Sequence, residues 1–233
     1  DWWWIPGAAV FVGLAALFTF LSPYLIPGQR DAPPALVAEA DRLAAEQGLP
    51  AIPVRIQEVD AWEGPNAAAT GLGPSRRVIL WNTLVDSFAE DEVRVVLGHE
   101  LAHHSRNHLW KNLGWYALFA VPGAFLIAWA AKRRGGMREP TAVPLALLML
   151  VVLQTLALPV QNAIIRHLEA EADWVALETT EDPDGARRLW RGFSEEALLD
   201  PSPPTWSSLL FETHPTVAQR IAMTEAWREH GGR

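Results

Sequence analysis

Residues 95–104 read Val-Val-Leu-Gly-His-Glu-Leu-Ala-His-His and contain the pattern His-Glu-x-x-His. On a helix, His99 and His103 lie one turn apart on the same face, so both imidazoles can reach one metal ion. Glu100 projects beside that pair, where it can accept a proton from a water molecule. The segment therefore predicts a helix that presents two metal ligands and a general base.

The residues before this helix predict another helix and a small sheet. Ser87 and Glu90 match the Ser-x-x-Glu capping box, which places the start of the motif helix after Ser87. An earlier helix is expected between Pro33 and Gly48, because apolar residues recur there at helical spacing. Two of three short strands flank a glycine-rich turn and are expected to form a hairpin. The three strands are expected at residues 53–59, 67–72 and 77–81.

A metal ion in this chain must be held by histidine and carboxylate side chains, because the sequence contains no cysteine. Zinc needs a third protein ligand, and Glu169 is the candidate, since residues 166–173 contain no glycine or proline and are expected to be helical. Asp173 lies one turn further along the same face, where it can accept a hydrogen bond from a ligand imidazole. Glu171 points elsewhere and is expected to be solvated, and it is the alternative third ligand. We expect one Zn²⁺ per chain.

Three uncharged stretches are long enough to cross a lipid bilayer, which takes about 20 helical residues. They cover residues 2–29, 112–131 and 140–165. The first begins with three tryptophans, as an interfacial belt does; it also resembles the apolar part of a signal peptide, but no small-residue cleavage site follows it. Lys and Arg bracket the other two, which favours a membrane hairpin over two buried helices of a soluble protein. The sequence therefore predicts an integral membrane protein.

The membrane hairpin accounts for the long sequence distance between the expected ligands. Two crossings return the chain to the side it left, so His103 and Glu169 must lie at the same face of the bilayer. Few glycine or proline residues separate either ligand from its span. We therefore expect both ligand helices to be continuations of the spans and the metal site to lie at the membrane surface.

Composition restricts the class of protein further. The 233 residues are 50% hydrophobic, which supplies enough apolar surface to exclude a disordered chain. A net charge of −8 argues against nucleic acid as a partner, because binding to phosphates needs a basic face. We expect the lipid bilayer as a partner.

The remaining histidines are expected to be less important for a metal site. His104, His108 and His167 lie off the metal face, where packing or solvation is the simplest role. His214 is in a loop that precedes a helix, and by itself it reads as a surface histidine. The chain after the third span is expected to contain a helix that follows residues 182–185, a proline-rich loop at 200–204 and a final amphipathic helix at 216–228.

Taken together, the motifs resemble those of the integral-membrane zinc metallopeptidases that include the type I CAAX prenyl protease and the HtpX-like bacterial heat-shock proteases. The resemblance extends from about Leu36 to Arg220, and its elements occur in the family's order. These elements are Asn66-Ala67, the hairpin end at residues 78–84, Glu92, the His-Glu-x-x-His segment at residues 96–103, His108, Arg166-x-x-Glu169-x-x-Ala172-Asp173, Thr213-His214-Pro215 and Arg220.

The resemblance implies a fold and a set of residue roles. The fold is α+β, mainly α: a membrane-embedded zincin-like (gluzincin) catalytic domain with a small β-sheet and three transmembrane helices. The resemblance implies that His99, His103 and Glu169 are zinc ligands and that Glu100 is the general base. It also implies that Asp173 is a carboxylate that binds a ligand imidazole, that His214 stabilises the oxyanion and that Arg220 orders the region of His214. Asn66 and Ala67 are implied to align the substrate backbone.

The implied activity is that of a zinc-dependent endopeptidase acting on membrane or misfolded proteins. The chain has Ile165 where the family commonly has serine, and it has fewer spans than the eukaryotic CAAX enzymes. A bacterial type of membrane protease is therefore favoured over a CAAX-type processing protease with a narrow C-terminal substrate. A different zinc hydrolase and an inactive relative that only binds metal are further alternatives, and the intact Glu100 argues against the inactive relative.

The predicted organisation has four parts: a transmembrane helix at residues 1–29, a first catalytic part at 30–111, a transmembrane hairpin at 112–165 and a second catalytic part at 166–233. The basic loop at residues 132–138 would lie in the cytoplasm by the positive-inside rule, which puts the metal site outside. The family's active sites usually face the cytosol, and four basic residues flank the spans on the catalytic side. We expect a bacterial cell membrane protein whose active site faces the cytoplasm.

Overall fold

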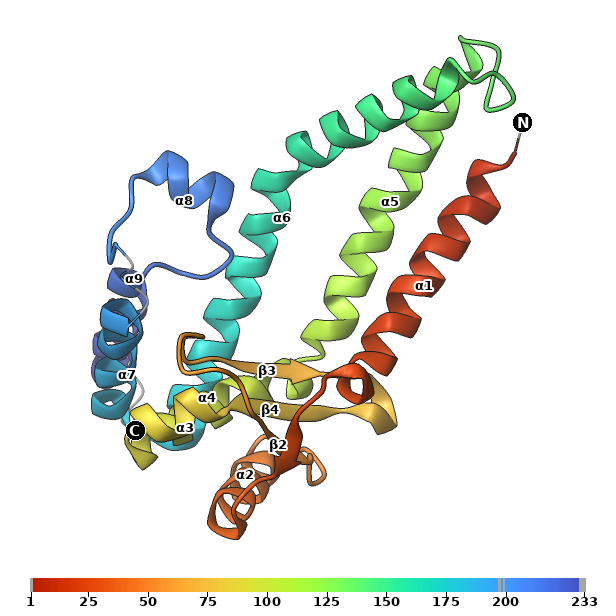
Figure 1. Ribbon diagram of the computed structural model, residues 1–233. Helices are drawn as coiled ribbons and strands as arrows, with labels where there is room; N and C mark the ends of the chain where they lie inside the picture. The colour runs from red at the N-terminus through yellow and green to blue at the C-terminus, as the bar shows by residue number, and fades with distance from the viewer. Residues whose placement is uncertain (1, 197, 199, 231–233) are drawn as a thin grey trace.

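The computed structural model describes residues 2–196, 198 and 200–230. Within that part of the chain, three helices are long and apolar enough to cross a membrane: α1 (Trp4–Leu25), α5 (His108–Lys132) and α6 (Ala142–Thr180). They lie side by side, α1 against α5 and α5 against α6, and rise together from the rest of the molecule (Figure 1). Most of their large apolar side chains are exposed, which confirms the three expected spans.

A small mixed sheet lies at the base of these helices (Figure 1). Its strand order is β1-β2-β4-β3, with β2 parallel to β4 and the other neighbours antiparallel. The expected hairpin is confirmed as β3 and β4, joined through a short 3-10 turn at Gly73–Ser75, whereas the three-residue β1 was not predicted. The strands are β1 (Gln29–Asp31), β2 (Val54–Gln57), β3 (Ala67–Thr70) and β4 (Arg77–Trp81).

One hydrophobic core joins the sheet to the helices around it. Leu97 and Leu101 on one face of the motif helix are fully buried among side chains of the sheet and of neighbouring helices. The opposite face of the same helix is thereby turned toward α6 and the candidate site. The helices outside the spans are α2 (Pro34–Glu46), α3 (Asn82–Ser87), α4 (Glu90–Ser105), α7 (Pro183–Glu196), α8 (Thr205–Phe211) and α9 (Val217–His230).

The motif helix α4 begins later than the sequence predicted. Ser87 is the last residue of α3 and does not cap α4. The Ala89 backbone N–H donates instead to Glu92 Oε2 at 2.9 Å, and Glu90, Asp91 and Glu92 all lie in the first turn of α4. A carboxylate that binds a free N–H near the positive end of a helix stabilises that end without any hydroxyl cap.

The expected continuity of ligand helices and spans is correct for one of the two. α6 runs unbroken from the membrane stretch through Glu169. The helix of His103 is separate, because α4 ends at Ser105 and α5 begins at His108. Asn107 between them has a left-handed backbone with φ 56°, a conformation that asparagine tolerates better than most residues.

A glycine permits α4 and α6 to approach each other closely at the site. A Cβ added at Gly98 would lie 3.3 Å from Cα of Ala176 on α6. The Gln47 side chain, at the end of α2, donates to the Gly98 carbonyl at 2.8 Å and so attaches a third helix to this crossing. Gly98 directly precedes His99, so this contact sets how far the two histidines lie from α6.

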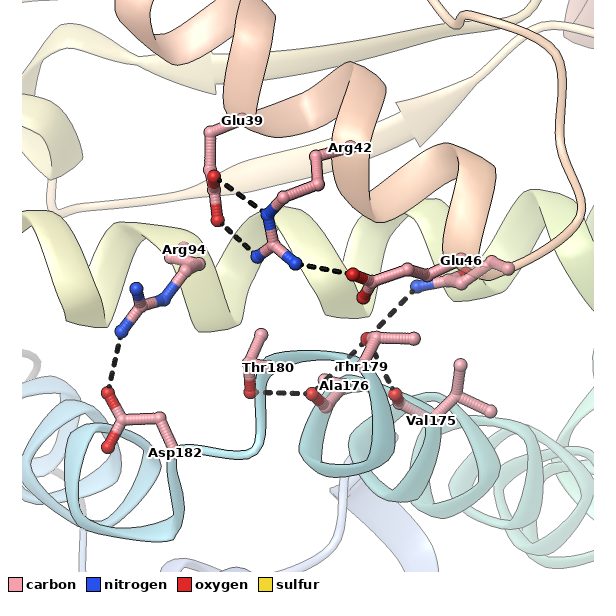
Figure 2. A network of polar contacts seen from close by, with 10 residues as sticks. Glu39, Arg42, Glu46, Arg94, Val175, Ala176, Thr179, Thr180 and Asp182 are labelled. Carbon is pink, nitrogen blue, oxygen red and sulfur yellow. Dashed lines mark hydrogen bonds and ion pairs between the residues drawn. The ribbon is translucent and has the colours of Figure 1, made fainter.

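Ion pairs lie behind the site, two of them within α2 and one between α4 and the residue before α7 (Figure 2). Arg42 lies between Glu39 and Glu46 on α2, with contacts of 2.6 and 2.5 Å. Arg94 of α4 contacts Asp182, just before α7, at 2.9 Å. A cavity of about 580 Å³ beside this network contains none of the predicted site residues. These ion pairs therefore lie outside the candidate site, and the one from Arg94 attaches α4 to the segment before α7.

Candidate metal centre

Three side chains from two helices converge on one point. His99 Nε2 and His103 Nε2 of α4 lie 3.1 Å apart. Glu169 of α6 places Oε2 3.2 Å from His99 Nε2 and Oε1 3.6 Å from His103 Nε2. His99 and Glu169 are buried, and one donor atom from each of the three lies within 4.8 Å of the others. The structure therefore brings together the three residues predicted to hold a metal.

The chemistry of these donors fits zinc. Two imidazoles and one carboxylate form a ligand set that catalytic zinc sites use, with one position left for water or substrate. Glu169 Oε2 is buried and has no hydrogen bond of good geometry within the described residues, although His99 Nε2 and His214 Nε2 each lie 3.2 Å from it. A buried carboxylate oxygen without a donor is costly unless a cation compensates it. The site would therefore suit a divalent cation.

Asp173 lies beside the first of the two histidines. His99 Nδ1 lies 2.9 Å from Asp173 Oδ1, while Nε2 faces the other donors. Arg220 Nε lies 3.0 Å from the other oxygen of Asp173, and its guanidinium stacks over the Trp190 ring at 4.1 Å. The Asp173 carboxylate thus has a partner on each side, and the roles of Asp173 and Arg220 stay predictions.

The second histidine has a partner that the sequence analysis missed. His103 Nδ1 lies 3.0 Å from Nδ1 of His108, which is fully buried at the start of α5. His108 Nε2 lies 3.2 Å from Glu171 Oε2, and Lys111 Nζ donates to the same oxygen at 3.2 Å. Glu171 is thus paired rather than simply solvated. If His103 binds a metal through Nε2, its Nδ1–H donates to His108, whose Nε2–H donates to Glu171.

Glu100 and His99 both line a cleft that opens beside the three converging donors. Only 7% of its surface is exposed, and this burial raises the pKa of its carboxyl to about 7. A pKa near neutrality suits a group that takes up a proton and later returns it. The structure therefore places a carboxyl with suitable acid–base properties next to the three converging donors.

His214 reaches the same centre from the other end of the chain. Its Nε2 lies 3.2 Å from Glu169 Oε2, although more than half of its side chain is exposed. Partial desolvation by the surrounding protein lowers the pKa of His214 below its ordinary value, and the Glu169 carboxylate opposes this shift. This histidine lies in the loop between α8 and α9, 115 positions after His99 in the sequence. It completes the rim of the centre. Sequence reasoning alone read His214 as a surface residue.

A cleft of about 350 Å³ opens beside these residues. Asn66 and Ala67 lie on one wall at the start of β3, the edge strand of the sheet. Trp190 and Phe193 of α7 contribute apolar surface to another wall. An edge strand offers unpaired backbone groups to an extended peptide. The cleft thus lies between the start of an edge strand and the candidate metal centre.

Two further histidines lie away from the centre. His104 is buried and its Nε2 lies 3.2 Å from the Arg77 carbonyl, while burial lowers its pKa to about 4, so the neutral ring donates to that carbonyl. His167 is exposed on α6. Both agree with the packing or solvation expected from sequence, in contrast to His108.

The model of peptidase family M48 matches residues 33–228 of this chain. A protein of Acidiphilium cryptum named as a protease HtpX homolog is 30% identical over 258 residues, which cover 94% of this chain and 88% of that protein. The protein of Bacillus subtilis called uncharacterized metalloprotease YhfN is 28% identical over 241 residues, which cover 96% of this chain and 56% of YhfN. The chain therefore spans little more than half the length of YhfN.

The fold is also similar to that of a solved structure. The crystal structure of Ste24p from S. mikatae superposes with a TM-score of 0.81 over 97% of this chain and 59% of Ste24p. The two sequences are 21% identical, so this likeness concerns the fold. It includes the helices that are long and apolar enough to span a membrane.

Proposed function

Because the chain belongs to peptidase family M48, we propose that it is a membrane-integral, zinc-dependent endopeptidase. The observation that supports this most directly is the convergence of His99, His103 and Glu169 beside the buried carboxyl of Glu100. The family and the three apolar helices support a membrane protein. We propose that it resides in a bacterial cell membrane with the cleft at the cytoplasmic face.

In this proposal each residue of the site has one task. His99, His103 and Glu169 would hold one zinc ion per chain, and Asp173 and Arg220 would fix the orientation of His99. When bound, zinc would polarise the scissile carbonyl and make a water molecule more acidic. Glu100 would accept the proton of the attacking water and return it to the leaving amine. His214 would donate a hydrogen bond to the developing oxyanion.

The substrate would bind in an extended conformation along β3. Backbone hydrogen bonds at Asn66 and Ala67 would align it, so that selection depends mainly on backbone exposure and access to the cleft. Extended segments of membrane or misfolded proteins present such backbone groups. We propose that residues 30–111 and 166–233 form the catalytic part of the chain. Residues 1–29 and 112–165 would form the membrane spans.

The decisive experiment measures zinc per chain in detergent-purified protein, wild type beside Glu169→Ala. We expect about one zinc in the wild type, and a large loss in the variant because one of three ligands is removed. Glu178→Ala is the matched control, since Glu178 lies on the same helix and contacts Trp174 instead of the centre.

Full zinc in the Glu169→Ala variant would show that another residue supplies the third ligand. No zinc in the wild type, after purification without chelators, would favour an inactive relative. Cleavage of a short C-terminal peptide but not of unfolded membrane protein would point to a narrow processing enzyme.

A further inference from the structure

The short helix α8 exposes an unusual amount of apolar surface. Trp206 is 64% exposed, Leu209 46% and Phe211 66%. The rings of Trp206 and Phe211 lie 6.4 Å apart, so they form one continuous patch. α8 has the sequence Thr-Trp-Ser-Ser-Leu-Leu-Phe, which contains no charged residue. Contiguous apolar patches on a protein surface mark a contact site for a partner or a membrane.

Hydrogen bonds fix α8 against the part of α6 that lies within the span. Asn162 Nδ2 donates to the Leu210 carbonyl at 2.7 Å, and Arg166 Nη1 donates to the Ser208 carbonyl at 2.9 Å. Asn162 belongs to the uncharged stretch at residues 140–165, whereas Arg166 is the first charged residue after it. Figure 1 shows α8 beside α6, nearer the membrane-spanning part of that helix than α7 or α9. The depth of α8 is therefore that of the membrane boundary of α6.

We propose that α8 lies in the lipid–water interface of the leaflet nearest the metal centre, with Trp206, Leu209 and Phe211 in contact with lipid. Tryptophan and phenylalanine on an uncharged helix favour the interfacial region, where such a helix buries its apolar face about 5–10 Å deep. Side chains of α6 within the span are exposed as well, since Val160 is 52% and Leu156 70% exposed.

Lipid contact at α8 would affect the cleft directly. His214 follows Phe211 by three residues, and the Glu212 carbonyl accepts a second hydrogen bond from Arg166 at 2.5 Å. The rim of the cleft that carries His214 is thus attached to the helix that enters the interface. For the proposed peptidase, this attachment would hold the cleft open toward segments that leave the bilayer.

The absence of cysteine permits a direct test with single labels. Leu209→Cys is labelled with an environment-sensitive fluorophore in the full chain, reconstituted at one chain per phosphatidylcholine–phosphatidylglycerol nanodisc. Two positions provide references: Ala45→Cys on α2, which is exposed and far from the spans, and Leu148→Cys, which is 59% exposed within α6 (Figure 1). Iodide reports exposure to water, and lipids with nitroxides at shallow or deep positions report depth.

We expect the label at position 209 to be protected from iodide relative to position 45 and quenched by shallow nitroxide lipids. The label at position 148 should be quenched by deep nitroxide lipids. Equal iodide quenching at positions 209 and 45 would overturn the proposal. Protection that appears only at two chains per disc, with no quenching by lipid, would also overturn it, because a second copy would then cover the patch. The readout requires no peptidase activity, so it is separate from the test of the proposed function.

Leu209→Cys itself is checked for folding by its thermal unfolding curve. If that variant does not fold, Trp206→Cys tests the same patch from the other end. Its label should show the same protection from iodide and the same quenching by shallow nitroxide lipids. A label at position 206 that is as accessible to iodide as position 45 contradicts the proposal.

Discussion

Replacement of His108 by leucine should weaken zinc binding without removing any ligand. His108 Nδ1 lies 3.0 Å from His103 Nδ1, and His108 is fully buried. When His103 binds zinc through Nε2, the proton of its ring must lie on Nδ1 and needs an acceptor. Leucine keeps the volume of the side chain approximately but accepts no hydrogen bond. The cost falls on the zinc-bound state, because only there is the ring of His103 held in a single orientation.

The size of the effect follows from this geometry. A buried donor left without a partner costs about 1–3 kcal/mol. Loss of a group that orients a metal ligand typically weakens metal affinity by about 10–100-fold, which agrees with that range. His108→Asn should retain most of the affinity, since its side-chain oxygen can take the place of Nδ1. Glu171→Gln should cost less than His108→Leu, because the amide can still accept from His108 Nε2.

The assay is competition for zinc with a chelating dye in detergent, together with the visible spectrum of the cobalt-loaded protein. We expect the cobalt bands of His108→Leu to shift and its zinc affinity to fall, with a smaller change in His108→Asn. His167→Leu is the control, as His167 is exposed on α6. Wild-type zinc affinity and an unchanged cobalt spectrum in His108→Leu would refute the reasoning, provided that His103→Leu loses zinc in the same assay.

Three further predictions concern other parts of the site. Glu100→Gln should keep its zinc but lose turnover by about 10²–10⁴-fold, as expected for a general base, and full activity in that variant would contradict the mechanism. His214→Ala should lower kcat more than it raises KM, and a change confined to KM would argue against a contact with the oxyanion. Gly98→Ala should lower the melting temperature, because overpacking against Ala176 costs about 1–3 kcal/mol and outweighs the gain of about 1 kcal/mol in helix propensity. Gly114→Ala is its control, since a Cβ there meets no atom within 4 Å, and equal melting temperatures for the two variants would show that the helices can separate.

Much of the fold could be predicted because its strongest signals are local. The spans follow from long uncharged stretches, and the hairpin of β3 and β4 follows from a glycine-rich turn between apolar segments. The proximity of His103 and Glu169 could be predicted with one further assumption, namely that a chain that crosses a membrane twice returns to the side it left. The roles of these residues in binding zinc remain predictions.

The features that were missed depend on contacts between distant segments or on short elements. The hydrogen bond between His108 on α5 and Glu171 on α6 joins residues that lie 63 positions apart in the sequence. No periodicity in either helix indicates this contact. The break at Asn107 has no glycine or proline to mark it, because asparagine adopts the left-handed conformation without a distinctive sequence pattern. α8 is too short for its apolar residues to show a helical period.

In the sequence, the membrane hairpin lies between the two histidine ligands on α4 and Glu169 on α6. This order has a consequence for biosynthesis. During translation, His99 and His103 leave the ribosome well before Glu169, which follows both α5 and the apolar part of α6. The three side chains can meet only after α6 has been synthesised and has packed against α4. A nascent chain that ends before Glu169 therefore lacks the complete centre.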